Sequence, residues 1–303
     1  MRKYIGFAAI YGWCAVIAYS MILTSNISQT LNPFLVCFLT FSTVTIIFFI
    51  YNAKNLPSLF ISKRFMLAKN DIAGINFSSF ISWGLMIYPL AYLEPTVVAT
   101  IILGINPIAT AIITKAFFKQ SPDTYLIYIS LALAFLISML ILNTLDGDGS
   151  VVNASQKNIY LSLLACILSG IATSCNNVFS KRLMGAGFSI SDLMCSRFLL
   201  TIILSSLISV QSGPIVLQSD MIASIATTTM LFVIVPLILL QVSLKNLDPL
   251  QVSVISPLMP VLVVVMQYIS NPKSISVFVA ALTLATWILV TGGTYVSIRL
   301  KNS

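Results

Sequence analysis

The sequence predicts an all-α polytopic membrane protein with ten transmembrane helices arranged as two inverted five-helix repeats. Three observations lead to this prediction. Hydrophobic side chains make up 58% of the 303 residues and charged side chains only 8%, whereas soluble globular proteins carry ~25% charged residues. Charge-free stretches follow one another along the whole chain. Finally, each half of the chain contains one acid-proline pair at a corresponding position.

The stretches between charges define the expected spans, because a charge in the middle of a bilayer is costly and is avoided. The first stretch, Tyr4–Ala53, is too long for one crossing. It contains the polar turn Ser25–Gln29, followed by Asn32 and Pro33, and so should hold two spans. Eight further stretches have spanning length: Ile72–Leu93, Pro95–Thr114, Thr124–Leu145, Asn158–Ser180, Phe198–Ser219, Met221–Leu244, Pro249–Pro272 and Ser274–Ile298.

Basic residues gather on one side of this ten-span arrangement. Only Lys157 and Lys273 fall on the other side. The positive-inside rule therefore predicts a multi-pass protein of the cell (inner) membrane with both termini in the cytoplasm. The net charge of +8 reflects this topology, and we expect no nucleic-acid partner. The basic side carries Arg2, Lys3, Lys54, Lys63, Arg64, Lys69, Lys115, Lys119, Lys181, Arg182, Lys245, Arg299 and Lys301.

An internal repeat is indicated by the two acid-proline pairs. Each pair opens a span that contains another proline about three turns later, and the two pairs are 154 residues apart. Five spans per half is an odd number, so the second half must enter the membrane from the opposite face. We expect repeats at 1–145 and 158–303, joined by an external linker at 146–157. The marker residues are Glu94-Pro95 with Pro107, and Asp248-Pro249 with Pro260.

The segments around these markers resemble a known family. Ala91–Pro95 leads to Asn106-Pro107, Leu244–Pro249 leads to Met259-Pro260, and Asn177–Arg182 is followed by Arg197. With these features the chain resembles the drug/metabolite transporter superfamily, in particular its EamA-like members. The resemblance implies alternating access to a central cavity lined mainly by helices one, three, four, six, eight and nine. Family members often carry an arginine in the second helix as well, where this chain has Leu39.

Mid-span prolines occur only in expected helices three, four, eight and nine. Each removes a backbone donor and leaves the carbonyl four residues earlier without its usual partner. Pro107 would free Leu103 and Pro260 would free Ser256, which suits either a kinked cavity wall with a gating role or a packing kink. Glu94 and Asp248 precede prolines, so we expect them to cap helices rather than carry protons.

Five residues are candidates for substrate binding. Arg197 lies two turns inside helix seven; it would bind a carboxylate or phosphate, or else snorkel to the surface or pair with Asp192. Asn177 lies on a small, polar stripe of helix six, and Tyr19 occupies the corresponding position in the first half. Such stripes also serve tight packing. The remaining candidates, near the centres of their spans, are Trp83 and Asn106.

Transport is the function we expect from these features. The chain contains no histidine and no carboxylate deep in a span, so we expect no enzyme activity, no metal and no cofactor. The expected cargo is a small organic metabolite, amino-acid-like and neutral, zwitterionic or monoanionic, moved by export or exchange. The alternatives are a nucleotide-sugar or phosphate-ester exchanger and a non-transporting membrane partner protein.

Overall fold

A computed structural model describes residues 2–54, 60–118, 124–146, 154–211, 219–270 and 276–301. All regular elements in these ranges are helical, which confirms the predicted all-α class for them. The elements are α1 (Arg2–Thr30), α2 (Pro33–Tyr51), α4 (Lys63–Leu67), α5 (Lys69–Ser79), η1 (Phe80–Gly84), α6 (Leu85–Ile87), η2 (Pro89–Ala91), α7 (Pro95–Phe118), α8 (Thr124–Leu145), α9 (Gln156–Gly185), α10 (Ile190–Ser196), α11 (Leu199–Val210), α12 (Ser219–Thr228), η3 (Thr229–Ile234), α13 (Val235–Asn246), α14 (Pro249–Ile255), α15 (Leu258–Ser270) and α16 (Val277–Lys301).

Long apolar helices make the chain a multi-pass membrane protein. Within the described residues, 7 helical stretches are long and apolar enough to cross a bilayer. Shorter apolar helices cover Leu131–Leu145 and Val277–Gly292. The seven stretches are Lys3–Thr30, Pro33–Tyr51, Pro95–Phe117, Gln156–Gly185, Ile190–Val210, Ala223–Asn246 and Gln251–Ser270.

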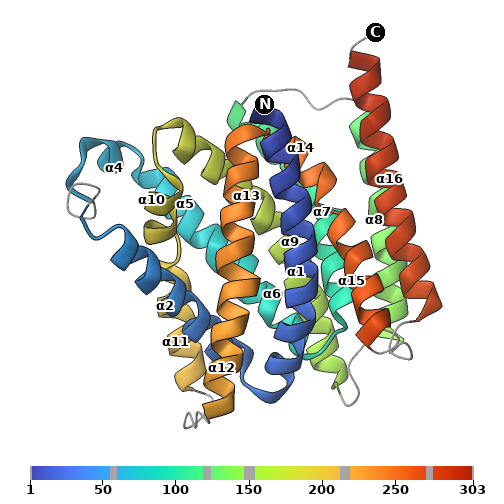
Figure 1. Cartoon of the computed structure of the whole chain (residues 1–303). Helices are drawn as coiled ribbons and strands as arrows, with labels where there is room; N and C mark the ends of the chain where they lie inside the picture. The colour runs from blue at the N-terminus through green and yellow to red at the C-terminus, as the bar shows by residue number, and fades with distance from the viewer. Residues whose placement is uncertain are drawn as a thin grey trace.

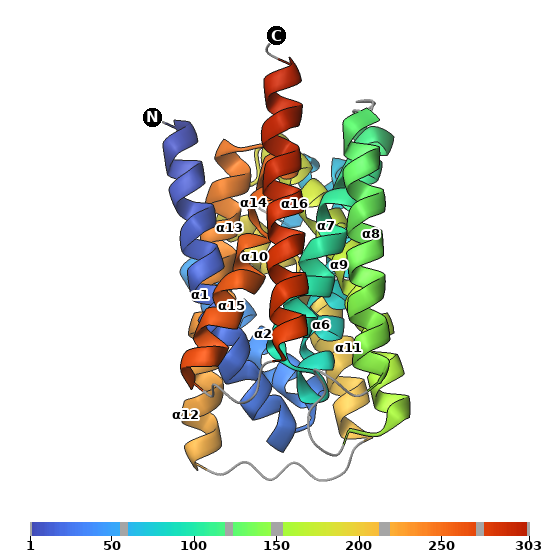
Figure 2. The ribbon, with the colours of Figure 1, turned by 90° about the vertical axis from the view of Figure 1, so that its right-hand side faces the viewer.

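The helices form an upright bundle in which α1 begins and α16 ends at the same end (Figures 1 and 2). The C-terminal end of α9 is also there, because Lys181 Nζ donates to the Leu247 carbonyl at 2.8 Å while Leu247 packs against Gly6 of α1. The N-terminal helix of the chain and α9 therefore run in opposite directions. On one side of the bundle, α8 packs against α16 (Figure 1).

One expected helix boundary was wrong. The polar turn predicted at Ser25–Gln29 is helical, and α1 ends only at Thr30. Hydrogen bonds within the fold hold two of its polar side chains: Ser25 Oγ donates to the Leu90 carbonyl at 2.8 Å and Gln29 Nε2 donates to Ser25 Oγ. The helical stretch Ile190–Val210 begins before the charge-free run Phe198–Ser219, so Arg197 lies two turns inside it, as expected, at the break between α10 and α11.

Helix starts follow the expected capping chemistry where the structure describes it. Asn32 caps α2, with its Oδ1 accepting from the Phe34 backbone N–H at 2.8 Å and Pro33 at the first helical position. Asp248 and Gln251 form a capping box at the start of α14, as predicted for Asp248. The Glu94 carboxylate accepts a hydrogen bond from Gln267 Nε2 at 3.2 Å, so it also joins α7 to α15.

Of the predicted linker at 146–157, residues 147–153 lie outside the described residues, and so do Lys119 and Lys273.

The described basic side chains Arg64, Lys181 and Arg182 cluster at the end where α1 begins. Arg64 pairs with Asp192 at 3.5 Å, and Arg182 pairs with Asp71 at 3.2 Å. The elements that meet there, α4, α5, α9 and α10, are thus joined by ion pairs.

Candidate functional site

Four interruptions of the helices lie around the middle of the bundle. Two are π-helical turns, η1 between α5 and α6 and η3 between α12 and α13. The other two are breaks, at residues 197–198 between α10 and α11 and at residues 256–257 between α14 and α15. Pro236 is the second residue after η3, and Pro257 lies within a break, so missing proline donors account for two of the four. The Ser82 carbonyl in η1 instead accepts a hydrogen bond from Ser169 Oγ of α9 at 2.7 Å.

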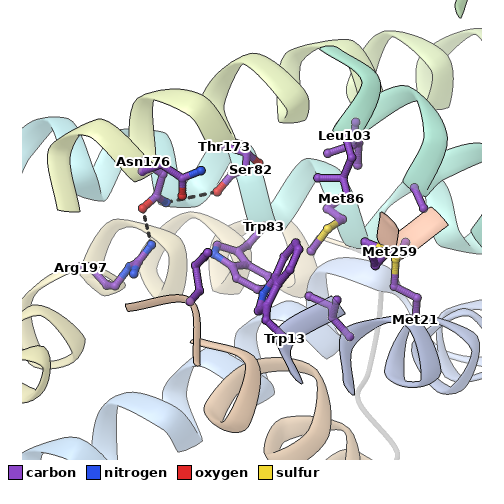
Figure 3. A pocket seen from close by; sticks show the side chains of 15 residues that line it. Trp13, Met21, Ser82, Trp83, Met86, Leu103, Thr173, Asn176, Arg197 and Met259 are labelled. Carbon is purple, nitrogen blue, oxygen red and sulfur yellow. Dashed lines mark hydrogen bonds between the residues drawn. The ribbon is translucent and has the colours of Figure 1, made fainter. Parts of the chain in front are cut away.

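A buried cavity lies between these interruptions (Figure 3). A water-sized sphere can move its centre through about 40 Å³ of it, which is room for water but not for a metabolite. The cavity is therefore narrow in this conformation. The lining residues come from α1, η1, α6, α7, α9, α13 and α15, together with Arg197: they are Trp13, Ile17, Met21, Ser82, Trp83, Met86, Ala99, Ile102, Leu103, Thr173, Asn176, Asn177, Arg197, Leu240 and Met259.

Arg197 is the charged residue of the lining, and its side chain is only 1% exposed. Both alternatives considered for it, snorkelling and pairing with Asp192, are contradicted. Asp192 instead accepts hydrogen bonds from Asn52 Nδ2 at 3.0 Å and from Arg64 Nη2 at 3.5 Å. No ion pair is found for Arg197 among the described residues.

Neutral groups hold part of the Arg197 guanidinium. Nη2 donates to Asn176 Oδ1, and Nε donates to Ser79 Oγ at 3.4 Å. The guanidinium carbon lies 5.1 Å from the centre of the Phe198 ring. Nη1 is buried and has no hydrogen-bond partner within the described part of the chain. One donor nitrogen of a buried cation is thus left unsatisfied.

Asn76 of α5 bridges the break that carries Arg197. Its Nδ2 donates to the Ser196 carbonyl at 2.6 Å, just before the break. Its Oδ1 accepts from the Leu200 backbone N–H at 3.3 Å, just after it. One amide side chain therefore replaces hydrogen bonds that an uninterrupted helix would make within itself. Asn76 is a positioning residue for Arg197.

Aromatic side chains form the centre of the site. The Trp83 ring of η1 meets Phe232 of η3 at a centroid distance of 5.7 Å and Phe41 of α2 at 5.6 Å, both edge to face. Phe41 in turn lies 4.6 Å from Phe198. These contacts join both π-helical turns to α2 and to the break after α10, so packed rings link three of the four interruptions.

The structure brings three of the five candidate residues together. Trp83, Asn177 and Arg197 all line the cavity. Asn106 is buried beside it and holds helices together: its Oδ1 accepts from Ser174 Oγ at 2.6 Å, and its Nδ2 donates to Ser256 Oγ at 3.4 Å.

Tyr19 and the two marker prolines lie apart from the lining. The Tyr19 side chain is 50% exposed on the outside of α1. Helix α7 continues through Pro107, whereas Pro260 is in the first turn of α15, after the break at residues 256–257. The Ser256 carbonyl accepts from the Met259 backbone N–H at 2.9 Å, so it is not unsatisfied as the proline argument expected.

Trp13 and Asn176 are lining residues that sequence reasoning missed. Trp13 forms a stripe with Ile17 and Met21 at four-residue spacing on α1, a signal visible in the sequence but shared by any buried helix face. Asn176 stands next to the candidate Asn177 and is the residue that actually binds Arg197. Adjacent residues on a helix face different neighbours, and the sequence alone does not show that Asn176, rather than Asn177, faces Arg197.

No family model and no curated protein sequence matches the chain. Among solved structures, one described only as "Crystal structure of protein" superimposes with a TM-score of 0.69. The alignment covers 100% of this chain and 99% of that chain at 16% sequence identity. At this identity the match speaks for the fold alone. The chain is therefore a multi-pass helical membrane protein whose fold, along its whole length, is similar to that of a solved structure.

Proposed function

We propose that the chain is a membrane transporter that moves a small organic metabolite by alternating access, as an exporter or exchanger. The observation that carries the proposal is the narrow cavity that lies among four helix interruptions. Interrupted helices around a central site are typical of transporters, because they let segments on either side of the site move separately. A scaffold protein needs neither the cavity nor the breaks.

Ten spans in two inverted repeats are part of this proposal. Four of the spans consist of joined pieces, namely α5 to α6, α10 to α11, α12 to α13 and α14 to α15. The opposite directions of α1 and α9 support inversion. So do the π-helical turns at corresponding places in each half, whose residues Trp83 and Phe232 touch. Contacts between corresponding residues are expected near the axis that relates two repeats.

The chain's resemblance to the drug/metabolite transporter superfamily, EamA-like members in particular, supports the same reading. The cavity lining agrees with what that resemblance implies for helices one, three, four, six, eight and nine. The lining supplies one cation, which is too little to neutralise a multivalent phosphate ester in a dry site. We therefore prefer a neutral, zwitterionic or monoanionic cargo to a nucleotide sugar.

Orientation follows from the basic end of the bundle, which we assign to the cytoplasm together with both termini. Single cysteines at two exposed positions test this in a variant that lacks the five native cysteines. In intact cells, Thr30→Cys should react with an impermeant thiol reagent, whereas Lys63→Cys should react only after permeabilisation. Reaction of Lys63→Cys in intact cells would refute the assignment.

Transport itself is tested with purified protein in liposomes. Counterflow is measured against pools of amino acids, monocarboxylates, sugars, nucleosides and phosphate esters, with protein-free liposomes as the control. We expect saturable counterflow of a small organic metabolite. Counterflow restricted to phosphate esters or nucleotide sugars would overturn the cargo class. Absence of counterflow for every pool, with folded protein, would speak for a non-transporting role.

A further inference from the structure

Two hydrogen-bond donors in the lining of the cavity have no partner. They are Nη1 of Arg197 and Nε1 of Trp13, both buried, with neither bonded to any described residue. Neither a guanidinium nor an indole N–H can accept a hydrogen bond. An unsatisfied buried donor costs about 1–3 kcal/mol, and more when it is charged. A molecule that satisfies this cavity must therefore bring acceptors.

The charge of the site points the same way. No carboxylate is present among the lining residues, and the ion pairs found in the described chain use Arg64 and Arg182 instead of Arg197. A buried cation without a counter-ion is strongly unfavourable in a membrane protein. One anionic group on a ligand would balance it. A second anionic group, or an ammonium group, would meet no opposite charge in the lining.

The remainder of the lining is apolar or aromatic. In Figure 3 Arg197 and Asn176 lie at one end of the cavity, the rings of Trp13 and Trp83 lie between, and methionines occupy the other end. Methionine side chains are flexible and adapt to apolar groups of different shape. The cavity is therefore polar at one end only. The methionines concerned are Met21, Met86 and Met259.

We infer that the cavity binds an organic monocarboxylate with an apolar or aromatic body and no amino group. The carboxylate accepts from Arg197 Nη1 and Trp13 Nε1, and the body lies against Trp83 and the methionines. This inference rests on the proposed function. It narrows the cargo from a neutral, zwitterionic or monoanionic metabolite to a monoanionic one. Because the narrow cavity holds only water-sized groups, the methionine and tryptophan side chains must move apart when the ligand enters.

Binding is tested without transport, on purified protein in detergent. Trp13 and Trp83 line the cavity, so a Trp287→Phe background leaves the fluorescence of those two residues to report binding. The probes are benzoate, its neutral amide benzamide, the dianion phthalate and the zwitterion phenylalanine. Benzoate should bind at least about tenfold more tightly than each of the others, as expected for a charged hydrogen bond in a buried site. Equal binding of benzoate and benzamide would overturn the inference.

Two variants locate the carboxylate. Arg197→Gln should abolish the preference for benzoate over benzamide, and Trp13→Phe should weaken benzoate several-fold while leaving benzamide nearly unchanged. Arg182→Gln removes an arginine outside the cavity and is the matched control. A benzoate preference that survives Arg197→Gln would contradict the assignment. If Arg197→Gln does not fold, the comparison of the four probes on the protein that keeps Arg197 still tests the inference.

The outcomes separate the inference from the proposed function. Selective benzoate binding without counterflow of any pool supports the site and contradicts transport. Counterflow of neutral or zwitterionic metabolites without selective benzoate binding supports transport and overturns the monocarboxylate. A fluorescence change with chloride alone, and no further change when benzoate is added, would identify an inorganic anion site and would also overturn the inference.

Discussion

The helix pairs α7–α9 and α1–α15 hold corresponding places in the two proposed repeats, yet they are built differently. In the first pair, α7 is continuous, and a Cβ on Gly170 of α9 would come within 2.7 Å of the Ile102 carbonyl oxygen. Ser174 Oγ adds a hydrogen bond of 2.6 Å to Asn106 Oδ1. In the second pair the span is broken between α14 and α15, and Cys14 Sγ reaches the Ile255 carbonyl only at 4.0 Å.

This difference shows which part of the site is held firmly and which is free to change. Close backbone approach and short hydrogen bonds hold α7 against α9, the helix that presents Asn176 and Asn177 to the cavity. Gln267 ties α15 to α7, but against α1 the broken span, whose α15 presents Met259, has among the described residues only the weak polar contact of Cys14 beside the break. We expect α15 to move against α1 during transport while α7 and α9 move together.

Glycine substitutions should give the largest contrast. Gly170→Ala forces α7 and α9 apart and should destabilise the protein by about 1–3 kcal/mol. Gly12 holds the corresponding place in α1. A Cβ there would meet Leu239 of α13 at an ordinary 3.6 Å and no described atom of α15 within 4 Å, so Gly12→Ala should be neutral or slightly stabilising. Thermal unfolding in detergent measures both. Equal effects of the two substitutions would contradict the proposed difference in packing between the two helix pairs.

Asn106 should show the next largest effect, because it joins α7, α9 and the break after α14. Asn106→Ala removes the side-chain hydrogen bonds to Ser174, Thr110 and Ser256, although Ser174 Oγ keeps the backbone carbonyl of residue 106 at 3.0 Å, and should cost about 1–3 kcal/mol. Ser256→Ala removes a hydrogen bond of 3.4 Å to the same amide and a local one of 3.0 Å to the Ser253 carbonyl, and should cost less. The two unfolding midpoints, compared under identical conditions, test this order. A larger loss for Ser256→Ala would make the break, and not α7, the firmly held element.

Proline substitutions should act on transport more than on folding, and with smaller effects. Pro257→Ala restores a backbone donor in the break and should slow counterflow several-fold by stiffening α14 and α15 into one helix. Pro107→Ala acts on a helix that is already continuous and should change counterflow less. Pro260→Ala, in the first turn of α15, should lie between them. Initial counterflow rates decide, and a slower rate for Pro107→Ala than for Pro257→Ala would contradict the comparison.

The sequence could predict the all-helical class and part of the site because both follow from where charge is tolerated. Arg197 stood out as a cation inside an apolar stretch, Trp83 by its depth in an expected span, and Asn177 by its place on a small, polar stripe. All three line the cavity. The cost of charge in a bilayer is a local property of the chain, so it can be seen without knowing the fold.

The rest depended on contacts between distant segments. Nothing in the sequence near Asn76 shows that its amide will bridge a break 120 residues further along, and the turn expected at Ser25–Gln29 became helix because Leu90 supplied a partner. Tyr19 was chosen by its correspondence to Asn177, but its side chain points out of the bundle. A corresponding position in an inverted repeat shares depth in the membrane without necessarily sharing the direction of the side chain.

Access to the cavity from both sides of the membrane is the central claim, and one cysteine tests it. Thr173→Cys is introduced into a variant lacking native cysteines, and the protein is sealed into oriented liposomes. An impermeant thiol reagent is then added on one side of the membrane at a time. Thr30→Cys, which should react from one side only, is the control. The account predicts that Thr173→Cys reacts from either side, and that cargo slows both reactions. Reaction from one side only, or from neither, would contradict alternating access at this site.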